Sequence, residues 1–329
     1  MTAVNAYEYS PGKMFIPYYA ASDKQLHFAE YNKGASLFSA SLLPSPATPL
    51  PPAGGCCSFR DPIPVAGVDD PFATLVAWNS LIYTAGGNPP NSYFNQAANL
   101  SDVIPHQFDT KFGNVSLSCL QPGLGPVCAV AWTDTNQGSI PVDSCGATFC
   151  IGNGYIHVLT TTTGNFGDAS SFDRWESGNS SIWTPAVAFV GKRLYVAWIG
   201  TDGSQLINIA FSDDYKHFDK VTELSNHARQ VCLAGVNGRL VLGFIGTDGQ
   251  INLQVWNGPI TQNPDHQYFI SPSGGAADTE RSYQMALSST SELEGLLVSW
   301  QQPANTTNLA WVTLPSASKL SRATRKPLK

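Results

Sequence analysis

Two stretches of the sequence decide the fold, Leu194-Tyr-Val-Ala-Trp-Ile-Gly-Thr-Asp-Gly203 and Leu240-Val-Leu-Gly-Phe-Ile-Gly-Thr-Asp-Gly249. In each, alternating apolar residues predict a half-buried strand that ends in an aromatic residue and a tight glycine-containing turn. A second strand is expected after each turn, over residues 206–211 and 251–256. Glycine next to a basic residue precedes each stretch and predicts a hairpin turn back to an earlier strand. The two stretches are therefore copies of one β-unit.

Fainter copies of this unit run through the whole chain. We expect the repeated aromatic residues to be structural, because they recur in every unit. Units of about 40 to 50 residues with four short strands are typical of propeller blades, which stack because one sheet cannot bury both its faces. The repeat therefore predicts an all-β, single-domain six-bladed β-propeller over residues 1–318, with five blades as the alternative. The repeated aromatics, six occurrences 46 to 66 residues apart, are Tyr18, Trp78, Trp132, Trp198, Phe244 and Trp300.

Two segments fall outside the repeat. Residues near 41–70 are rich in proline and predict an irregular insertion, and residues 319–329 predict a basic, solvated C-terminal tail. The segments between the predicted strands have no helical periodicity, which excludes a parallel α/β fold.

Composition narrows the class of protein further. Of the 329 residues, 13% are charged and 11% aromatic, which excludes bulk disorder and helical bundles. The net charge is −6 and no basic stripe occurs, so nucleic acid is not an expected partner. No run of about 18 apolar residues is present, so we expect no membrane insertion.

The seven cysteines lack the paired spacing of a zinc site, and we expect no metal. Cys119 and Cys128 flank one turn, and Cys145 and Cys150 close another loop. Disulfides at both places would imply an oxidising compartment, with buried thiols as the alternative. No signal peptide is visible, yet we expect a secretory or extracellular protein. Four glycosylation sequons, about the number expected by chance, start at Asn99, Asn114, Asn179 and Asn305.

Residues 211–218, Phe-Ser-Asp-Asp-Tyr-Lys-His-Phe, resemble the degenerate Asp-box turn of sialidase-like (BNR) β-propellers. The resemblance implies that a Ser-x-Asp pair, here Ser212 and Asp214, pins a hairpin while an aromatic residue packs beneath it. This motif is structural and implies a fold, not a function. Sialidases additionally need three arginines, a tyrosine nucleophile with its glutamate, and an acid aspartate. Only Arg229 and Arg281 stand where inner strands begin, which argues against sialidase activity.

In size, repeat style, missing hydrolase residues and charge-poor, aromatic-rich composition, the chain is similar to the fungal hetero-Diels–Alderases of tropolonic sesquiterpene biosynthesis. That resemblance implies a cofactor-independent pericyclase that joins a tropolone quinone methide to a humulene-type sesquiterpene, a meroterpenoid step of secondary metabolism. The expected partner is a small apolar or aromatic substrate, and the oligomeric state is left open.

The loops that enter inner strands and those that join second to third strands share one face of a propeller. We expect Arg229 and Arg281 to polarise an acidic ligand oxygen and His227 to act as a general acid. Their structural alternatives are ion pairs on a blade face and an exposed loop histidine. Stacking on a flat ligand is expected for Trp183 and Tyr283, with core packing as the alternative. The remaining predicted substrate-binding residues are Gln230, Gln284, His106 and Phe108.

Two other functions compete with the pericyclase. A secreted carbohydrate-binding lectin would repeat its binding residues from blade to blade, whereas Trp183, Arg229 and Arg281 differ between units. A sialidase-like glycoside hydrolase would need two carboxylates about 5 to 9 Å apart, and few acids are expected near the channel mouth. The sequence thus favours one unique pocket over repeated sites.

Overall fold

The structure is a computed structural model of the chain. It describes the backbone of residues 7–10, 13–20, 25–32, 66–69, 74–78, 81–86, 93–99, 116–120, 127–133, 139–143, 148–152, 154–163, 166–167, 169–181, 185–201, 205–228, 230–246, 250–270, 285–289, 295–302, 306–315 and 326–327. Side chains are described for residues 116–120, 127–133, 155–163, 166–167, 170–181, 185–201, 205–219, 222–228, 230–246, 250–270, 285, 287, 295–300 and 310–315.

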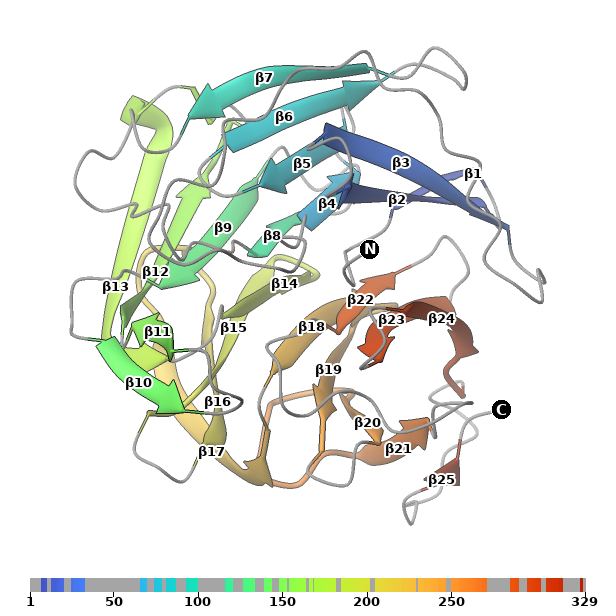
Figure 1. Cartoon of the computed structure of the whole chain (residues 1–329). Coiled ribbons are helices and arrows are strands. Elements are labelled where there is room, and N and C mark those ends of the chain that lie inside the picture. The colour runs from blue at the N-terminus through green and yellow to red at the C-terminus, as the bar shows by residue number, and fades with distance from the viewer. Residues whose placement is uncertain are drawn as a thin grey trace.

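Six antiparallel sheets follow one another around a common axis (Figure 1). The first three blades are β1 (Tyr7–Ser10), β2 (Lys13–Ala20) and β3 (Gln25–Asn32); β4 (Ala66–Asp69), β5 (Thr74–Trp78), β6 (Leu81–Gly86) and β7 (Tyr93–Asn99); and β8 (Ser116–Cys119), β9 (Cys128–Thr133), β12 (Gly154–Thr161) and β13 (Phe172–Ser181). The last three are β14 (Ala186–Val190), β15 (Arg193–Ile199), β16 (Leu206–Ser212) and β17 (Asp219–His227); β18 (Val231–Val236), β19 (Arg239–Ile245), β20 (Ile251–Trp256) and β21 (His266–Ile270); and β22 (Ala286–Ser289), β23 (Gly295–Gln302) and β24 (Thr306–Thr313).

This arrangement confirms the predicted six-bladed all-β propeller and excludes five blades. A short hairpin, β10 (Ser139–Asp143) with β11 (Thr148–Gly152), is inserted between the second and third strands of the third blade. A 3-10 turn, η1 (Ala169–Ser171), precedes β13. In the described part of the chain, no helix is long and apolar enough to cross a membrane.

The two segments predicted to lie outside the repeat contribute to the sheets. The last residues of the Pro-rich segment form β4, the first strand of the second blade, and residues 33–65 lie outside the described residues. In the predicted tail, β25 (Lys326–Pro327) pairs in parallel with β21, Tyr268 opposite Lys326.

Tight turns explain why the fourth and fifth blades carry the clearest repeats. Gly191 has a φ of 58° in the turn between β14 and β15. Asn237 and Gly238, with φ of 47° and 74°, form the two-residue loop between β18 and β19. Positive φ at both central positions is the requirement of a type I′ hairpin, which Asn-Gly meets at little cost.

Apolar side chains fill the seams between neighbouring blades. Alternate residues of each strand point to opposite faces of its sheet, so one strand contributes to two seams. Leu194, Val196 and Trp198 of β15 pack with the third blade, whereas Tyr195 and Ala197 pack with the fifth. Each blade is therefore stabilised by burial against both neighbours.

In the Asp-box-like turn, Ser212 and Asp214 are hydrogen-bonded as the resemblance implies, and the turn also contacts the third blade. Asp214 Oδ1 accepts hydrogen bonds from Ser212 Oγ (3.0 Å) and from the backbone N–H groups of Lys216 (2.9 Å) and His217 (2.8 Å). The Phe218 ring packs 4.4 Å from that of Trp175 in β13. The turn thus links two blades as well as two strands.

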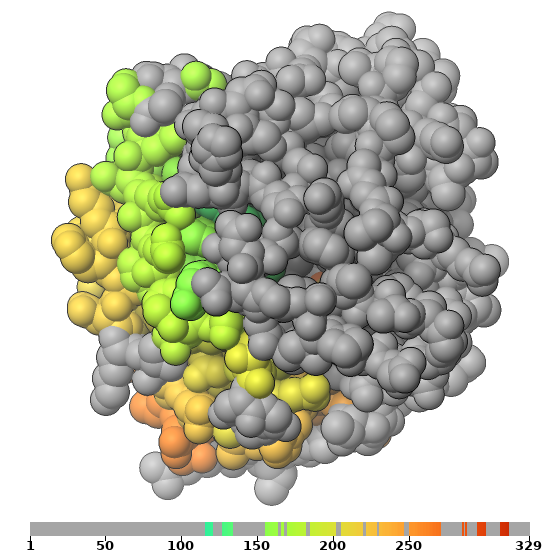
Figure 2. Space-filling view, turned by 60° about the vertical axis from the view of Figure 1, so that its left-hand side comes forward, coloured from blue at the N-terminus to red at the C-terminus, as the bar shows by residue number. Residues whose placement is uncertain are grey.

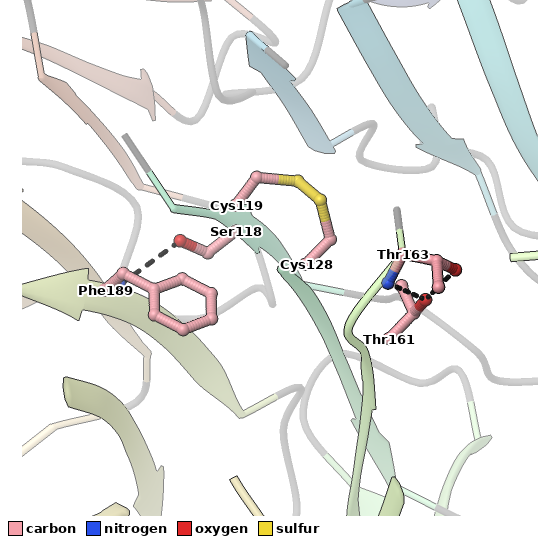
Figure 3. Close-up of a disulfide and its surroundings, with 6 residues drawn as sticks. All are labelled: Ser118, Cys119, Cys128, Thr161, Thr163 and Phe189. Carbon is pink, nitrogen blue, oxygen red and sulfur yellow. Dashed lines mark hydrogen bonds between the residues drawn. A yellow bond between two sulfur atoms is a disulfide. The ribbon is translucent and has the colours of Figure 1, made fainter. Parts of the chain in front are cut away.

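A disulfide joins the first two strands of the third blade (Figure 3). Cys119 pairs with Cys128 directly across the β8–β9 register, which confirms one predicted disulfide. Cys145 lies outside the described residues, so its predicted pairing with Cys150 stays a prediction. Next to the disulfide, Ser118 Oγ accepts a hydrogen bond from the Phe189 N–H of β14 (3.3 Å), and Ser116 Oγ accepts one from Val187 (3.1 Å). These hydroxyls satisfy N–H groups of the neighbouring blade.

Candidate functional site: polar rows in the seams

The structure describes two of the predicted site residues, His227 and Gln230. Trp183, Arg229, Arg281, Tyr283, Gln284, His106 and Phe108 lie outside the described residues, so their roles stay predictions.

His227 is the last residue of β17, where it pairs with Leu206, and its side chain is exposed. The strand therefore extends through His227, whose structural alternative was an exposed loop histidine. Ala228 N–H continues the contact by donating to the carbonyl of Gln205 (3.3 Å). Gln230 Oε1 accepts a hydrogen bond from the backbone N–H of Met285 (2.9 Å), just before β22. Gln230 thus links the fifth blade to the sixth.

The repeated aromatic residues are part of the scaffold, as predicted. In the described blades Trp132, Trp198, Phe244 and Trp300 are 1%, 2%, 4% and 4% exposed. Side chains buried to this extent do not offer a stacking surface to a ligand.

A row of side chains that the sequence did not reveal crosses the third blade from Trp132. Trp132 pairs with His157 of β12, and His157 pairs with Glu176 of β13. The Trp132 and His157 rings stack with centroids 5.2 Å apart and planes 20° apart. Paired residues of an antiparallel sheet share one face, so the three side chains form a continuous line from the buried indole to the outer rim.

Arg174 completes this row with a positive charge. Its Nη2 donates to His157 Nδ1 (3.0 Å) and to Glu176 Oε2 (3.1 Å). The His157 side chain is only 1% exposed, whereas Arg174 and Glu176 are 27% and 52% exposed. A buried ring pair therefore supports an accessible guanidinium and carboxylate, which together offer hydrogen-bond donors and acceptors at fixed positions.

The same row recurs in the fourth blade. Trp198 pairs with Asn208 of β16, and Asn208 pairs with Glu223 of β17, whose side chain is exposed. Asn208 Nδ2 donates to the carbonyl of Leu206 (3.1 Å), which fixes the amide near the start of β16. An aromatic, a polar planar residue and a glutamate thus occupy matching positions in two successive blades.

The fifth blade retains only the first part of the row. Phe244 pairs with Asn252, whose Nδ2 donates to the carbonyl of Gln250 (3.0 Å) in the same way, but Asn252 pairs with Phe269 instead of a glutamate. The blade places Gln254 in the seam with the fourth blade, where its Nε2 donates to Asn226 Oδ1 (2.8 Å). Of these three blades, the third and fourth therefore carry the accessible carboxylate.

Each row faces the preceding blade. Ile156 and Val158, on either side of His157, pack against the fourth blade, so His157 and Glu176 point toward the second. Ile207 and Ile209 pack against the fifth blade, so Asn208 and Glu223 point toward the third. Surfaces of the third blade (green) and the fourth (yellow) lie side by side in Figure 2. The two glutamates therefore stand at the rims of two successive seams.

One sequence signal could have revealed the second row. Asn208 and Asn252 stand at matching positions after the two Gly-Thr-Asp-Gly turns, allowing for two inserted residues. The glutamates follow on strands of different length with register shifts at Leu206/Asn208 and Tyr155/His157, so their equivalence emerges only from the pairing.

Comparison with known structures supports the fold, whereas comparison with known sequences identifies no family. No family model and no curated protein sequence matches the chain. A lectin of Aleuria aurantia in complex with α-methyl-L-fucoside superposes with a TM-score of 0.59 at 9% identity, covering 96% of this chain and 91% of that one. The SapL1 lectin in complex with α-methyl fucoside gives a TM-score of 0.54 at 13% identity, covering 95% and 92%. Another structure of the Aleuria aurantia lectin, described as a six-bladed β-propeller with a novel fucose recognition mode, gives 0.59 at 9% identity, covering 94% and 89%. This chain therefore has the architecture of six-bladed β-propeller lectins.

Proposed function

We propose that this protein is a carbohydrate-binding β-propeller whose sugar sites lie at the rims of the seams between blades. The observation that carries the proposal is the recurrence of the aromatic–polar–glutamate row in the third and fourth blades. Repetition from blade to blade is what distinguishes a lectin from an enzyme with one pocket. The end-to-end similarity to fucose-binding lectins supports the same choice.

The chemistry of the rim suits a polyhydroxylated ligand. Glu176 accepts hydrogen bonds from hydroxyl groups, and Arg174 donates to hydroxyl oxygens beside it. Hydrogen bonds that involve a charged partner contribute about 1.5–3 kcal/mol each, which is enough for recognition of a small sugar when several form together. A disulfide and this function together fit a secreted protein.

No observation on the described residues favours the hetero-Diels–Alderase, and the structural neighbours lend that reading no support. Hydrolysis is also less favoured, because each described row supplies one carboxylate, whereas glycosidases need a pair. Sugar binding without chemistry accounts for both rows.

Calorimetric titration of the full chain tests the proposal, with α-methyl-L-fucoside as first probe and methyl glycosides of galactose, mannose and N-acetylglucosamine as further probes. We expect saturable binding of at least one glycoside and about tenfold weaker affinity at the third-blade site in Glu176→Gln, because a charged acceptor becomes neutral. Asp173→Asn is the matched control: Asp173 lies on the same strand but pairs with Lys216 (Nζ–Oδ1 3.0 Å) on the other side.

The controls separate the two parts of the proposal. Absence of binding to every glycoside would overturn the function. If Glu176→Gln leaves binding unchanged, the proposed rim site is wrong and the sugar binds elsewhere on the propeller.

A further inference from the structure

Two arginines at the same position of successive blades have different surroundings. Arg193 and Arg239 are the first residues of β15 and β19, each directly after its hairpin turn. Arg193 donates Nε and Nη2 to the two carboxylate oxygens of Asp213 (2.6 and 2.7 Å) and lies over the Phe211 ring. This arginine is a half-buried, ion-paired member of a blade face.

In the fifth blade, an asparagine occupies the position of the aspartate that pairs with Arg193 in the fourth. The strand register puts Asn257 where the fourth blade has Asp213, and the Asn257 N–H donates to Asp265 Oδ2 (2.7 Å). Arg239 turns into the protein, is 4% exposed, and donates Nη1 to the carbonyl of Pro315 (2.9 Å), after the last strand of the sixth blade. A guanidinium is thus buried where two blades meet.

Two further polar side chains are buried on the same side of this blade. His266 and Tyr268 alternate along β21, are 5% and 4% exposed, and have ring centroids 6.3 Å apart. Tyr268 belongs to the core cluster shared with the sixth blade. Neither His266 Nδ1 nor Tyr268 Oη has a hydrogen-bond partner, although both atoms are inaccessible to solvent.

Buried polar atoms without partners are uncommon, and a bound water or ion is one explanation for two of them that lie close together. Burial raises the pKa of Tyr268 and lowers the pKa of His266 and Arg239. The Tyr268 hydroxyl can donate a hydrogen bond, as can His266 Nδ1 in its protonated tautomer. The nearby carboxylate Asp265 is already bound to the Asn257 N–H. The site therefore offers donors and positive charge.

We propose that Arg239, His266 and Tyr268 form a binding site for a small oxyanion, such as sulfate, phosphate or a carboxylate group, in the seam between the fifth and sixth blades. Oxyanions supply the acceptors that the Tyr268 hydroxyl and His266 Nδ1 lack, and a negative charge suits a site beside a buried guanidinium. The site lies at the start of β19, next to the β18–β19 hairpin turn. The predicted ligand-binding face instead carries the turns at the opposite ends of the strands. The site is independent of sugar binding.

Titration of the full chain with sulfate at constant ionic strength tests this site, and crystals grown with selenate locate the anion by its anomalous signal. We expect one selenium peak beside Tyr268 and His266. Tyr268→Phe keeps the ring and removes one donor, so we expect about tenfold weaker sulfate binding. Arg193→Met is the matched control at the equivalent turn position and should leave sulfate affinity unchanged.

Thermal unfolding gives a second readout, and its sign is reversed if the site is empty. In sulfate, Tyr268→Phe should melt below the wild type because it loses a ligand contact. Without an anion, the same substitution removes a buried hydroxyl that has no partner and should raise the melting temperature. A higher melting temperature of Tyr268→Phe in sulfate, or no selenium peak at the cluster, would overturn the proposal.

Discussion

Gly235 shows how a single residue sets the distance between two blades. It lies in β18, beside the β14 backbone of the fourth blade, where a Cβ would overlap the carbonyl oxygen of Phe189 and come within 3.4 Å of Val190 Cγ2. Backbone cannot move aside as a flexible side chain can. The close approach of these two strands therefore requires a residue without a side chain.

Gly235→Ala should destabilise the fold by about 1–3 kcal/mol, because the added methyl group forces the two inner strands apart. Urea unfolding followed by tryptophan fluorescence measures the change. Gly258→Ala is the control, because a Cβ there meets nothing within 4 Å, and it should leave the unfolding midpoint nearly unchanged. Equal effects of the two substitutions would contradict the close approach.

At the scale of an element, the Asp-box-like turn depends on one ionised carboxyl group. Hydrogen bonds from the His217 side chain, and then from the backbone N–H groups of His217 and Lys216, hold the pKa of Asp214 well below its ordinary value of 3.8. A carboxyl whose pKa is lowered on folding stabilises the fold above its unfolded pKa, and this contribution is lost as the pH falls through the folded pKa.

Asp214→Asn keeps an oxygen acceptor but removes the charge, so it should lower the urea midpoint at pH 6. The difference from the wild type should narrow steadily between pH 4 and pH 2, because Asp214 then gains a proton in the unfolded wild-type chain. Urea unfolding at a series of pH values measures both curves. A difference that is constant over this range would show that the charge of Asp214 does not stabilise the turn.

The elements also explain which features could be predicted from sequence. Blades with short turns keep the repeat visible: Trp198 and Asn208 are 10 residues apart in the sequence. In the third blade the β10–β11 hairpin separates the equivalent Trp132 and His157 by 25 residues, so sequence alignment did not pair them. The blade scaffold was predictable because it depends on local alternation. The polar rows were not, because cross-strand register brings their members together.

At the scale of the whole molecule, the polar rows favour several binding sites over one pocket. Loop residues such as Trp183 and Arg229 differ between blades, and from them the sequence favoured a unique apolar pocket. The sheets present the opposite pattern, since Glu176 and Glu223 occupy one register position in consecutive blades. A propeller repeats its seams by construction, so a residue that recurs at the rim of a seam indicates repeated sites.

The number of bound ligands therefore distinguishes the two readings. Native mass spectrometry of the full chain with its best glycoside should detect at least two ligands per wild-type chain, one fewer for Glu176→Gln, one fewer for Glu223→Gln, and two fewer for the double variant. The losses should add because the glutamates serve different seams and share no partner among the described residues. A single ligand per chain in all four proteins would instead indicate one pocket, away from both rows.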